Sequence, residues 1–159
     1  KIHLFNKRSL NDEIIADIIV ESSELKGCEL DAEMAKLMID EYPILSVAAT
    51  FAKSPSLFKG LKELKIKESN RLELIRENLD RCGVYCKVNN NELFIDPTKN
   101  ISLKNNVIKT NFDHRIAMSF AIMGSLLGYD LEILDSDSIK TSFPNFNKIF
   151  NEAGGNIIE

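Results

Sequence analysis

Three segments of the sequence place ionisable residues directly before an apolar run, and this pattern restricts the fold more than any other feature. The ionisable residues are Asp40 and Glu41 in the first segment, Lys67, Glu68 and Arg71 in the second, and Asp113, His114 and Arg115 in the third. The runs that follow are largely apolar, which is typical of helices buried in a protein interior. A buried helix turns its N-terminal end outward, and that end carries unpaired N–H groups and partial positive charge. We therefore expect several helix starts to meet at one rim and to form an anion-binding site there.

The rest of the chain predicts an alternation of strands and helices. Apolar spacing predicts helices over residues 31–39, 40–52, 69–82, 113–127 and 144–153. Strand-like segments lie at residues 1–6, 13–21, 56–59, 61–66, 84–88, 92–95, 106–109, 129–134 and 156–158. This order predicts the α/β class, with one supersecondary unit used more than once. We expect residues 1–159 to form most of one domain, which begins partway through such a unit.

Composition excludes some function classes. The net charge of −4 gives no general attraction to nucleic acid or to a membrane surface. No apolar run approaches the ~20 residues that a membrane-spanning helix needs. The odd number of cysteines favours reduced thiols and a cytoplasmic location, and we interpret all three as small hydrophobic residues. Only two histidines are present and the cysteines lack metal-ligand spacing, so we expect no metal site.

Cations at a helix start need a reason, because the helix dipole disfavours each exposed one by roughly 0.3–1 kcal/mol. An anionic ligand would offset that cost for Lys67, Arg71 and Arg115. A second interpretation is a solvated surface pair, because Glu68 and Arg71 are three positions apart on a helix. The two aspartates, Asp40 and Asp113, are candidate N-caps and need no functional explanation by themselves.

Five stretches of the sequence, taken together, resemble the EPSP synthase family. They are IVESSELKG, MIDEYPILSVAATFA, LKIKESNRL, FDHRIAMSFA and TSFPNF, in this order. The patterns KES-x-RL, DHR-IAM and DE-x-P are the specific part of the likeness, which covers most of the chain from about Asp17 onward. The resemblance is to the C-terminal part of the proteins in that family. It implies an inverted α/β fold of two domains, each with three βαβαββ units, in which helices are buried and sheets lie outside. The other domain would then lie outside this sequence.

The resemblance also implies a reaction. The family transfers the enolpyruvyl group of phosphoenolpyruvate to the 5-hydroxyl of shikimate 3-phosphate, with release of phosphate, in the shikimate pathway of aromatic amino acid biosynthesis. It uses no metal and no organic cofactor. The methylene carbon is protonated, the hydroxyl attacks the resulting cationic carbon, and a tetrahedral intermediate loses phosphate and a proton. This chemistry needs an acid, a base and dense positive charge. The implied partners are the two small-molecule substrates and the missing domain, with no nucleic acid and no membrane.

Roles in that reaction follow from the resemblance residue by residue. Asp40 matches the carboxylate that binds and deprotonates the attacking hydroxyl of shikimate 3-phosphate. Glu68 matches the proton donor to the methylene carbon, and Lys67 matches a lysine that contacts shikimate 3-phosphate. Arg71 and Arg115 match the arginines that bind phosphoenolpyruvate. A supporting hydrogen-bond role is implied for a sixth residue, His114.

The sequence departs from the family pattern in two places. Asn70 stands where an aspartate is usual, which we expect to leave Arg71 without an orienting carboxylate. Thr141 stands where some members have a lysine, with Lys140 one position earlier, and no site role is assigned to either residue.

Two other functions stay open at this point. The first is a phosphate-binding or structural half-domain without turnover, because the phosphoshikimate-binding serines, glutamine and basic residues of the first domain have no counterpart in this sequence. The second is another enolpyruvyl transferase that acts on a nucleotide-sugar, against which the KES-x-R and DHR patterns argue. In every case we expect the isolated chain to lack activity.

Overall fold

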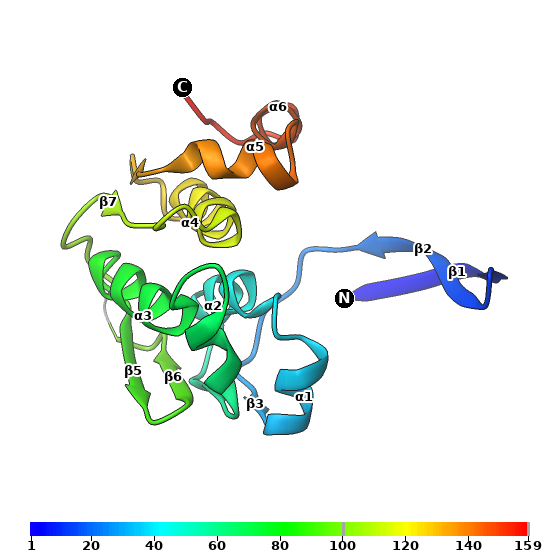
Figure 1. Cartoon of the computed structure of the whole chain (residues 1–159), viewed down its shortest axis with the longest axis horizontal. Helices are drawn as coiled ribbons and strands as arrows, with labels where there is room; N and C mark the ends of the chain where they lie inside the picture. Colours follow the sequence, from blue (N-terminus) through cyan, green and yellow to red (C-terminus); the bar gives the residue numbers. More distant parts are fainter. Residues whose placement is uncertain (100, 159) are drawn as a thin grey trace.

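Strands and helices alternate along the chain, as the sequence predicts (Figure 1). The computed structural model describes residues 1–99 and 101–158. The strands are β1 (Ile2–Leu10), β2 (Glu13–Val20), β3 (Glu29–Leu30), β4 (Ser56–Phe58), β5 (Tyr85–Asn89), β6 (Glu92–Asp96), β7 (Val107–Ile108) and β8 (Glu132–Ile133). The α-helices are α1 (Ala32–Leu37), α2 (Tyr42–Thr50), α3 (Arg71–Arg81), α4 (His114–Leu127), α5 (Ile139–Ser142) and α6 (Phe146–Glu152). Two short 3₁₀ helices are η1 (Leu61–Ile66) and η2 (Ser136–Ser138).

One unit recurs in this order. From β3 to β6 the chain runs strand, helices, strand, helix and two strands, and from β7 it again runs strand, helix, strand and helices. The first two strands of each unit pair in parallel, β3 with β4 and β7 with β8. A parallel pair needs a crossover connection, which α2 and α4 supply. The larger sheet has the order β3-β4-β6-β5 and its last two strands form a hairpin. The α/β class and the recurring unit are therefore confirmed.

The core lies between the helices and the larger sheet. Helix α4 packs against α2 and α3 on one side and against α5 on the other (Figure 1). The main cluster of buried apolar side chains includes Val47, Phe58, Ile75, Ile95 and Phe120. The apolar runs after the charged segments are thus largely buried, and they fix the helix starts in place.

The ends of α3 and α4 agree with the sequence. Gly83 follows the C-cap of α3 and has φ +82°, a left-handed conformation that glycine adopts without the strain that a Cβ brings. Gly128 ends α4 in the same way, with φ +68°. Asp113 caps the start of α4, since its carboxylate accepts hydrogen bonds from the backbone of Arg115 and Ile116.

The start of α2 differs from the prediction. Asp40 does not cap this helix, because the cap position is held by Glu41, whose side chain forms no capping hydrogen bond. The carboxylate of Asp40 is instead directed at Lys67 and Arg71. Ion pairing across the fold has displaced local capping here.

The predicted strand at 61–66 is wrong. This segment forms η1, which follows Gly60 in a left-handed conformation. Leu61 and Leu64 are both buried, and side chains three positions apart lie on the same face of a helix. In a strand they would point to opposite faces.

The predicted strand at 156–158 is also absent. The side chain of Asn151 accepts a hydrogen bond from the backbone N–H of Ile157 at 2.7 Å and donates to its carbonyl oxygen at 3.0 Å. These two bonds occupy the backbone groups that a neighbouring strand would use. The segment therefore runs beside α6 without joining a sheet.

Strands β1 and β2 form a ribbon that projects from the rest of the chain (Figure 1). It includes exposed apolar side chains, among them Ile2, Leu4, Ile14, Ile18 and Val20. None of its residues belongs to the two buried apolar clusters of the described chain. A two-stranded ribbon is marginally stable by itself, so its apolar side chains gain stability only when other residues cover them.

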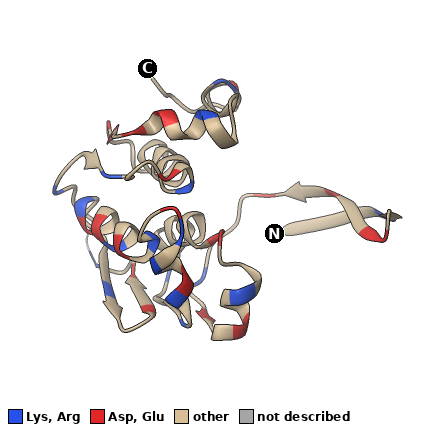
Figure 2. Ribbon diagram, in the orientation of Figure 1, with Lys and Arg blue, Asp and Glu red and all other residues tan. Residues whose placement is uncertain are grey.

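Two further features of the fold are the distribution of charged residues and the length of the apolar helices. Acidic and basic residues are interspersed over the ribbon and the rest of the chain rather than gathered by sign (Figure 2). Within residues 1–99 and 101–158, no helix is both long enough and apolar enough to cross a membrane.

Candidate active site

Arg71 is the centre of a charged cluster where the starts of α2, α3 and α4 meet. Its side chain is 0% exposed. Its Nε donates to Oδ2 of Asp113 at 2.8 Å, and its Nη1 donates to Oδ1 of Asp40 at 2.8 Å. Its Nη2 forms an ion pair with Oε2 of Glu68 that lacks hydrogen-bond geometry. A buried guanidinium needs such partners, because an unpaired buried charge is strongly destabilising. Arg71 therefore connects carboxylates from three segments of the chain.

Asp40 is contacted by three cations. Its Oδ1 lies 3.2 Å from Nζ of Lys67 and 2.8 Å from Nη1 of Arg71. Its Oδ2 lies 3.8 Å from Nη2 of Arg115, whose Nη1 also donates to the backbone carbonyl of Asp40 at 3.1 Å. The side chain of Asp40 stays 38% exposed, so the carboxylate can be reached from solvent. Asp40 is thus the shared, accessible anion of the cluster.

The environment of Asp40 sets its charge. Partial burial favours the neutral acid, but the hydrogen bond and charge of Lys67, with the charges of Arg115 and Arg71, outweigh it and hold the pKa of Asp40 below its usual value. Asp40 is therefore ionised near neutral pH and can accept a hydrogen bond from a hydroxyl.

Asp113 does two things with one carboxylate. Its Oδ1 accepts hydrogen bonds from the backbone N–H groups of Arg115 at 3.0 Å and Ile116 at 3.3 Å, and so caps α4. Its Oδ2 accepts hydrogen bonds from Arg71 and, at 2.8 Å, from the hydroxyl of Ser69. Burial opposes ionisation, yet the bonds from Arg71 and Ser69, the charge of Arg71 and the N–H of Ile116 lower the pKa of Asp113. Asp113 is thus a buried anion held by both α3 and α4.

The structure brings most of the predicted site residues together. Asp40, Lys67, Glu68, Arg71 and Arg115 all belong to the cluster. The side chain of Glu68 is 52% exposed, which leaves its carboxyl group accessible at the surface of the cluster.

His114, the sixth predicted site residue, is not joined to the cluster in the same way. It is the first residue of α4 and is partly buried. Within the described chain its ring forms no hydrogen bond or ion pair.

Two expectations about Arg71 are corrected. The pair of Glu68 and Arg71 is not a solvated surface pair, because Arg71 is fully buried. The asparagine at position 70 does not leave Arg71 without an orienting carboxylate, because Asp113 supplies one. Asn70 instead caps α3, accepting a hydrogen bond from the backbone N–H of Glu73 at 3.2 Å.

Sequence reasoning missed three contributions to the cluster. Ser69 binds Asp113, and Asp113 binds Arg71 from 42 positions away. Glu41 pairs with Arg115, with 3.7 Å between Oε1 and Nη1. Local spacing gives no signal for contacts over such separations. The recurrence of charged helix starts was the one signal that brought these segments together.

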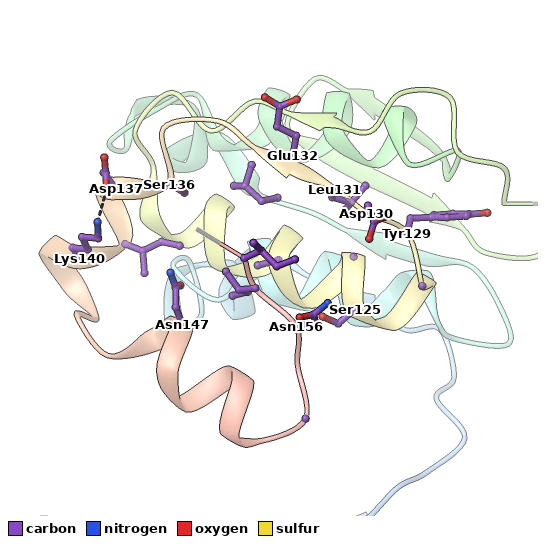
Figure 3. A pocket seen from close by; sticks show the side chains of 18 of the residues that line it. Ser125, Tyr129, Asp130, Leu131, Glu132, Ser136, Asp137, Lys140, Asn147 and Asn156 are labelled. Carbon is purple, nitrogen blue, oxygen red and sulfur yellow. Dashed lines mark hydrogen bonds and ion pairs between the residues drawn. The ribbon is translucent and has the colours of Figure 1, made fainter.

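A cavity of about 770 Å³ lies elsewhere, at the C-terminal end of α4 (Figure 3). It is bounded by α4, β8, α5 and the segment after α6, and its lining includes Ser125, Tyr129, Glu132 and Asn156. Lys140 also lines it and pairs with Asp137 at 2.7 Å. None of the six predicted site residues borders it. The charged cluster lies at the start of α4, the opposite end of this helix from the cavity.

Metal ligands are not grouped in the part of the chain that the structure describes. No set of three or more His, Cys, Asp or Glu side chains there is arranged to hold a metal ion. The carboxylates of the cluster have arginine and lysine as their partners.

The fold is the one found in solved enolpyruvyl transferases. A solved structure of the enolpyruvyl transferase NikO from Streptomyces tendae matches 95% of this chain with a TM-score of 0.60 at 13% identity, which is a likeness of fold alone. Two solved structures of EPSP synthase from Acinetobacter baumannii match 99% of the chain, with TM-scores of 0.86 and 0.83 at 32% and 28% identity.

Sequence comparison identifies the family. The family described as EPSP synthase (3-phosphoshikimate 1-carboxyvinyltransferase) matches residues 7–150, and the chain belongs to it. A 3-phosphoshikimate 1-carboxyvinyltransferase of Paramagnetospirillum magneticum is 42% identical over 156 residues, which are 98% of this chain and 35% of that relative. One from Campylobacter jejuni subsp. doylei is 48% identical over 145 residues, 91% of this chain and 33% of that relative. The chain thus spans about a third of the length of these relatives.

Proposed function

We propose that the protein containing this chain transfers the enolpyruvyl group of phosphoenolpyruvate to the 5-hydroxyl of shikimate 3-phosphate in the cytoplasm. We also propose that the chain is the C-terminal part of that enzyme. The observation that carries the proposal is the cluster around Asp40, in which an accessible carboxylate is surrounded by Lys67, Arg71 and Arg115 beside the carboxyl group of Glu68. It supplies an acid, a base and positive charge within one site, as the reaction requires.

Each residue has a role that its surroundings support. Asp40 accepts the hydrogen bond of the attacking hydroxyl, and Lys67, 3.2 Å from that carboxylate, binds the same substrate. Glu68, at the exposed side of the cluster, donates the proton to the methylene carbon. Arg115 binds the anionic groups of phosphoenolpyruvate. His114 supports the site from the first turn of α4.

The role of Arg71 requires an exchange of partners. Both of its terminal nitrogens are paired with carboxylates of this chain, so a phosphate or carboxylate of phosphoenolpyruvate must replace Glu68 or Asp40 there. Nε stays on Asp113 during the exchange.

Charge balance explains why this chain needs the rest of the protein. Three cations of the cluster face four carboxylates, namely Asp40, Glu41, Glu68 and Asp113. The two substrates bring two phosphate groups and two carboxylates. Further cations must come from residues outside this chain, together with the surface that closes over the substrates and excludes water. We therefore propose that the isolated chain has no turnover.

The proposal is tested with the full-length protein and phosphorus NMR. Mixed with phosphoenolpyruvate and shikimate 3-phosphate, it should release inorganic phosphate and form an enol ether of the second substrate. A nucleotide-sugar acceptor should give neither product. Transfer to the nucleotide-sugar alone would favour the second enolpyruvyl transferase function, and no transfer to either acceptor would favour a non-catalytic domain. The isolated chain should show no turnover near the ~1–10³ s⁻¹ typical of enzymes.

A further inference from the structure

We propose that Asp113 is a positioning residue that anchors Arg71 and, through Arg71 and Ser69, sets the place of Glu68. This inference rests on the proposed function, because it assigns Asp113 a purpose in that reaction. Asp113 touches no reacting atom in this role. Its effect passes through the guanidinium that it holds.

The contacts of Asp113 divide between its two oxygens. Oδ1 is occupied by the backbone of α4, and Oδ2 is occupied by Nε of Arg71 and Oγ of Ser69, both at 2.8 Å. Asp113 and Arg71 are both 0% exposed, so the pair is shielded from water. Charge-assisted hydrogen bonds of this kind are short, directional and stronger than neutral ones.

Capping alone does not account for this arrangement, as a second aspartate in the same chain demonstrates. Asp31 caps α1 by accepting hydrogen bonds from the backbone of Glu33 at 3.1 Å and Met34 at 3.0 Å. Asp31 is exposed, and its side chain accepts these hydrogen bonds from the helix backbone. Asp113 performs the same capping while buried and paired to a cation. Its second oxygen is therefore the feature that needs a function.

The anchor has a geometric consequence. With Nε fixed on Asp113, the planar guanidinium can turn its two terminal nitrogens only toward Asp40 and Glu68. Ser69 follows Glu68 directly in the chain, so its bond to Asp113 holds the backbone that carries the acid. Misplacement of a catalytic group by about 1 Å can cost on the order of 10²-fold in rate. Asp113 therefore fixes the acid and the anion-binding nitrogens relative to one another.

The test compares D113N with D31N in the full-length protein. Asparagine caps helices about as well as aspartate, so each variant keeps the cap and loses one negative charge. The first readout is hydrogen exchange of the Arg71 Nε–H, followed by NMR on protein labelled in arginine. We expect slow exchange in the wild type and in D31N, and exchange on the order of 10-fold faster in D113N.

The second readout is steady-state kinetics. We expect kcat of D113N to fall on the order of 10- to 100-fold, with a raised KM for phosphoenolpyruvate, while D31N keeps the wild-type values. Slow Nε–H exchange and wild-type kinetics in D113N would overturn the proposal, since Asp113 would then act as a cap alone.

Two further outcomes are separated by design. If D113N does not fold, S69A tests the part of the proposal that acts through Ser69, because it removes one bond to Oδ2 and leaves Asp113 and Arg71 in place. A fall in its kcat supports that part, and an unchanged kcat overturns it. The anchor on Arg71 is then judged in the wild type, where fast exchange of the Arg71 Nε–H would overturn it. If the wild type shows no enolpyruvyl transfer, the proposed function fails, and the Nε–H exchange in D113N against D31N still decides whether Asp113 anchors Arg71.

Discussion

Arg71 and Asp40, 31 positions apart in the sequence, are joined by a hydrogen bond of 2.8 Å between Nη1 and Oδ1. The arginine is fully buried, and the aspartate is 38% exposed. The pair therefore connects the interior of the domain to a carboxylate that solvent can reach. The bond places the buried positive charge of Arg71 beside the accessible carboxylate of Asp40.

Replacement of Arg71 by methionine should destabilise the protein. Three carboxylates lose their shared partner, and breaking a buried ion pair on one side typically costs about 3–5 kcal/mol. Urea unfolding of the full-length protein measures the loss. Arg76→Met is the matched control, because Arg76 pairs with Glu73 on a partly exposed helix face and should cost no more than ~1 kcal/mol. Equal losses in the two variants would contradict the central place of Arg71.

Stability should fall with acid partly through Asp113. Its pKa is lowered in the folded protein, so the ionised carboxylate stabilises the fold at every pH above its ordinary value of 3.8. That contribution is lost as the pH falls below 3.8 and through the lower folded value. The difference in melting temperature between the wild type and Asp113→Asn should therefore be constant near neutral pH and shrink below pH 3.8. A difference that stays constant down to pH 2 would contradict the pairing of Asp113 with Arg71.

Arg115→Lys should weaken phosphoenolpyruvate more than shikimate 3-phosphate. A guanidinium binds a carboxylate or phosphate with two parallel hydrogen bonds, which an ammonium group cannot reproduce. The variant keeps the positive charge beside Asp40, so the cluster should remain folded. The measurement is KM for each substrate in the full-length enzyme. Equal weakening of both substrates would indicate a structural role for Arg115 through its bond to the backbone of Asp40.

The cysteines should differ in reactivity. Cys28 is exposed, Cys82 is buried and Cys86 is partly buried. Burial raises the pKa of Cys82 to about 12, and burial with the charge of Asp80 raises that of Cys86 to about 11, so neither forms much thiolate at pH 8. We expect a thiol reagent to modify Cys28 in the folded chain, and Cys82 and Cys86 only after denaturation. Peptide mapping identifies the modified residues, and rapid native labelling of Cys82 would contradict the described core.

Much of the fold could be predicted because its signals are local. Leu72, Ile75 and Leu79 repeat at helical spacing in α3, and all three are buried. The hairpin of β5 and β6 turns at Asn90, which has φ +55°. Asparagine tolerates this left-handed conformation better than most residues. The strand prediction for residues 61–66 failed because the buried residues Leu61 and Leu64 are three positions apart, which fits a helix and not the alternation of a strand.

The site could be predicted only in part, because its geometry depends on long-range pairing. The sequence motifs identified Asp40, Glu68 and Arg71 as site residues, and both carboxylates contact Arg71 in the structure. Spacing could not indicate that Asp113 would use its second oxygen to hold Arg71, since the two residues are 42 positions apart in the sequence. The prediction that Asp40 caps α2 was wrong for the same reason, because Asp40 pairs with Lys67 and Arg71 from a distant part of the sequence.

The most direct measurement follows solvent deuterium into the methylene group of phosphoenolpyruvate, in the full-length enzyme and in its Glu68→Gln variant. Glutamine keeps the shape of the side chain but cannot donate the proton, and loss of general acid catalysis typically slows a reaction by ~10²–10⁴-fold. We predict that deuterium incorporation and turnover both fall by that order while both substrates still bind. Incorporation and turnover at wild-type rates in Glu68→Gln would contradict the proposal, and Glu68 would then serve only as an ion-pair partner of Arg71.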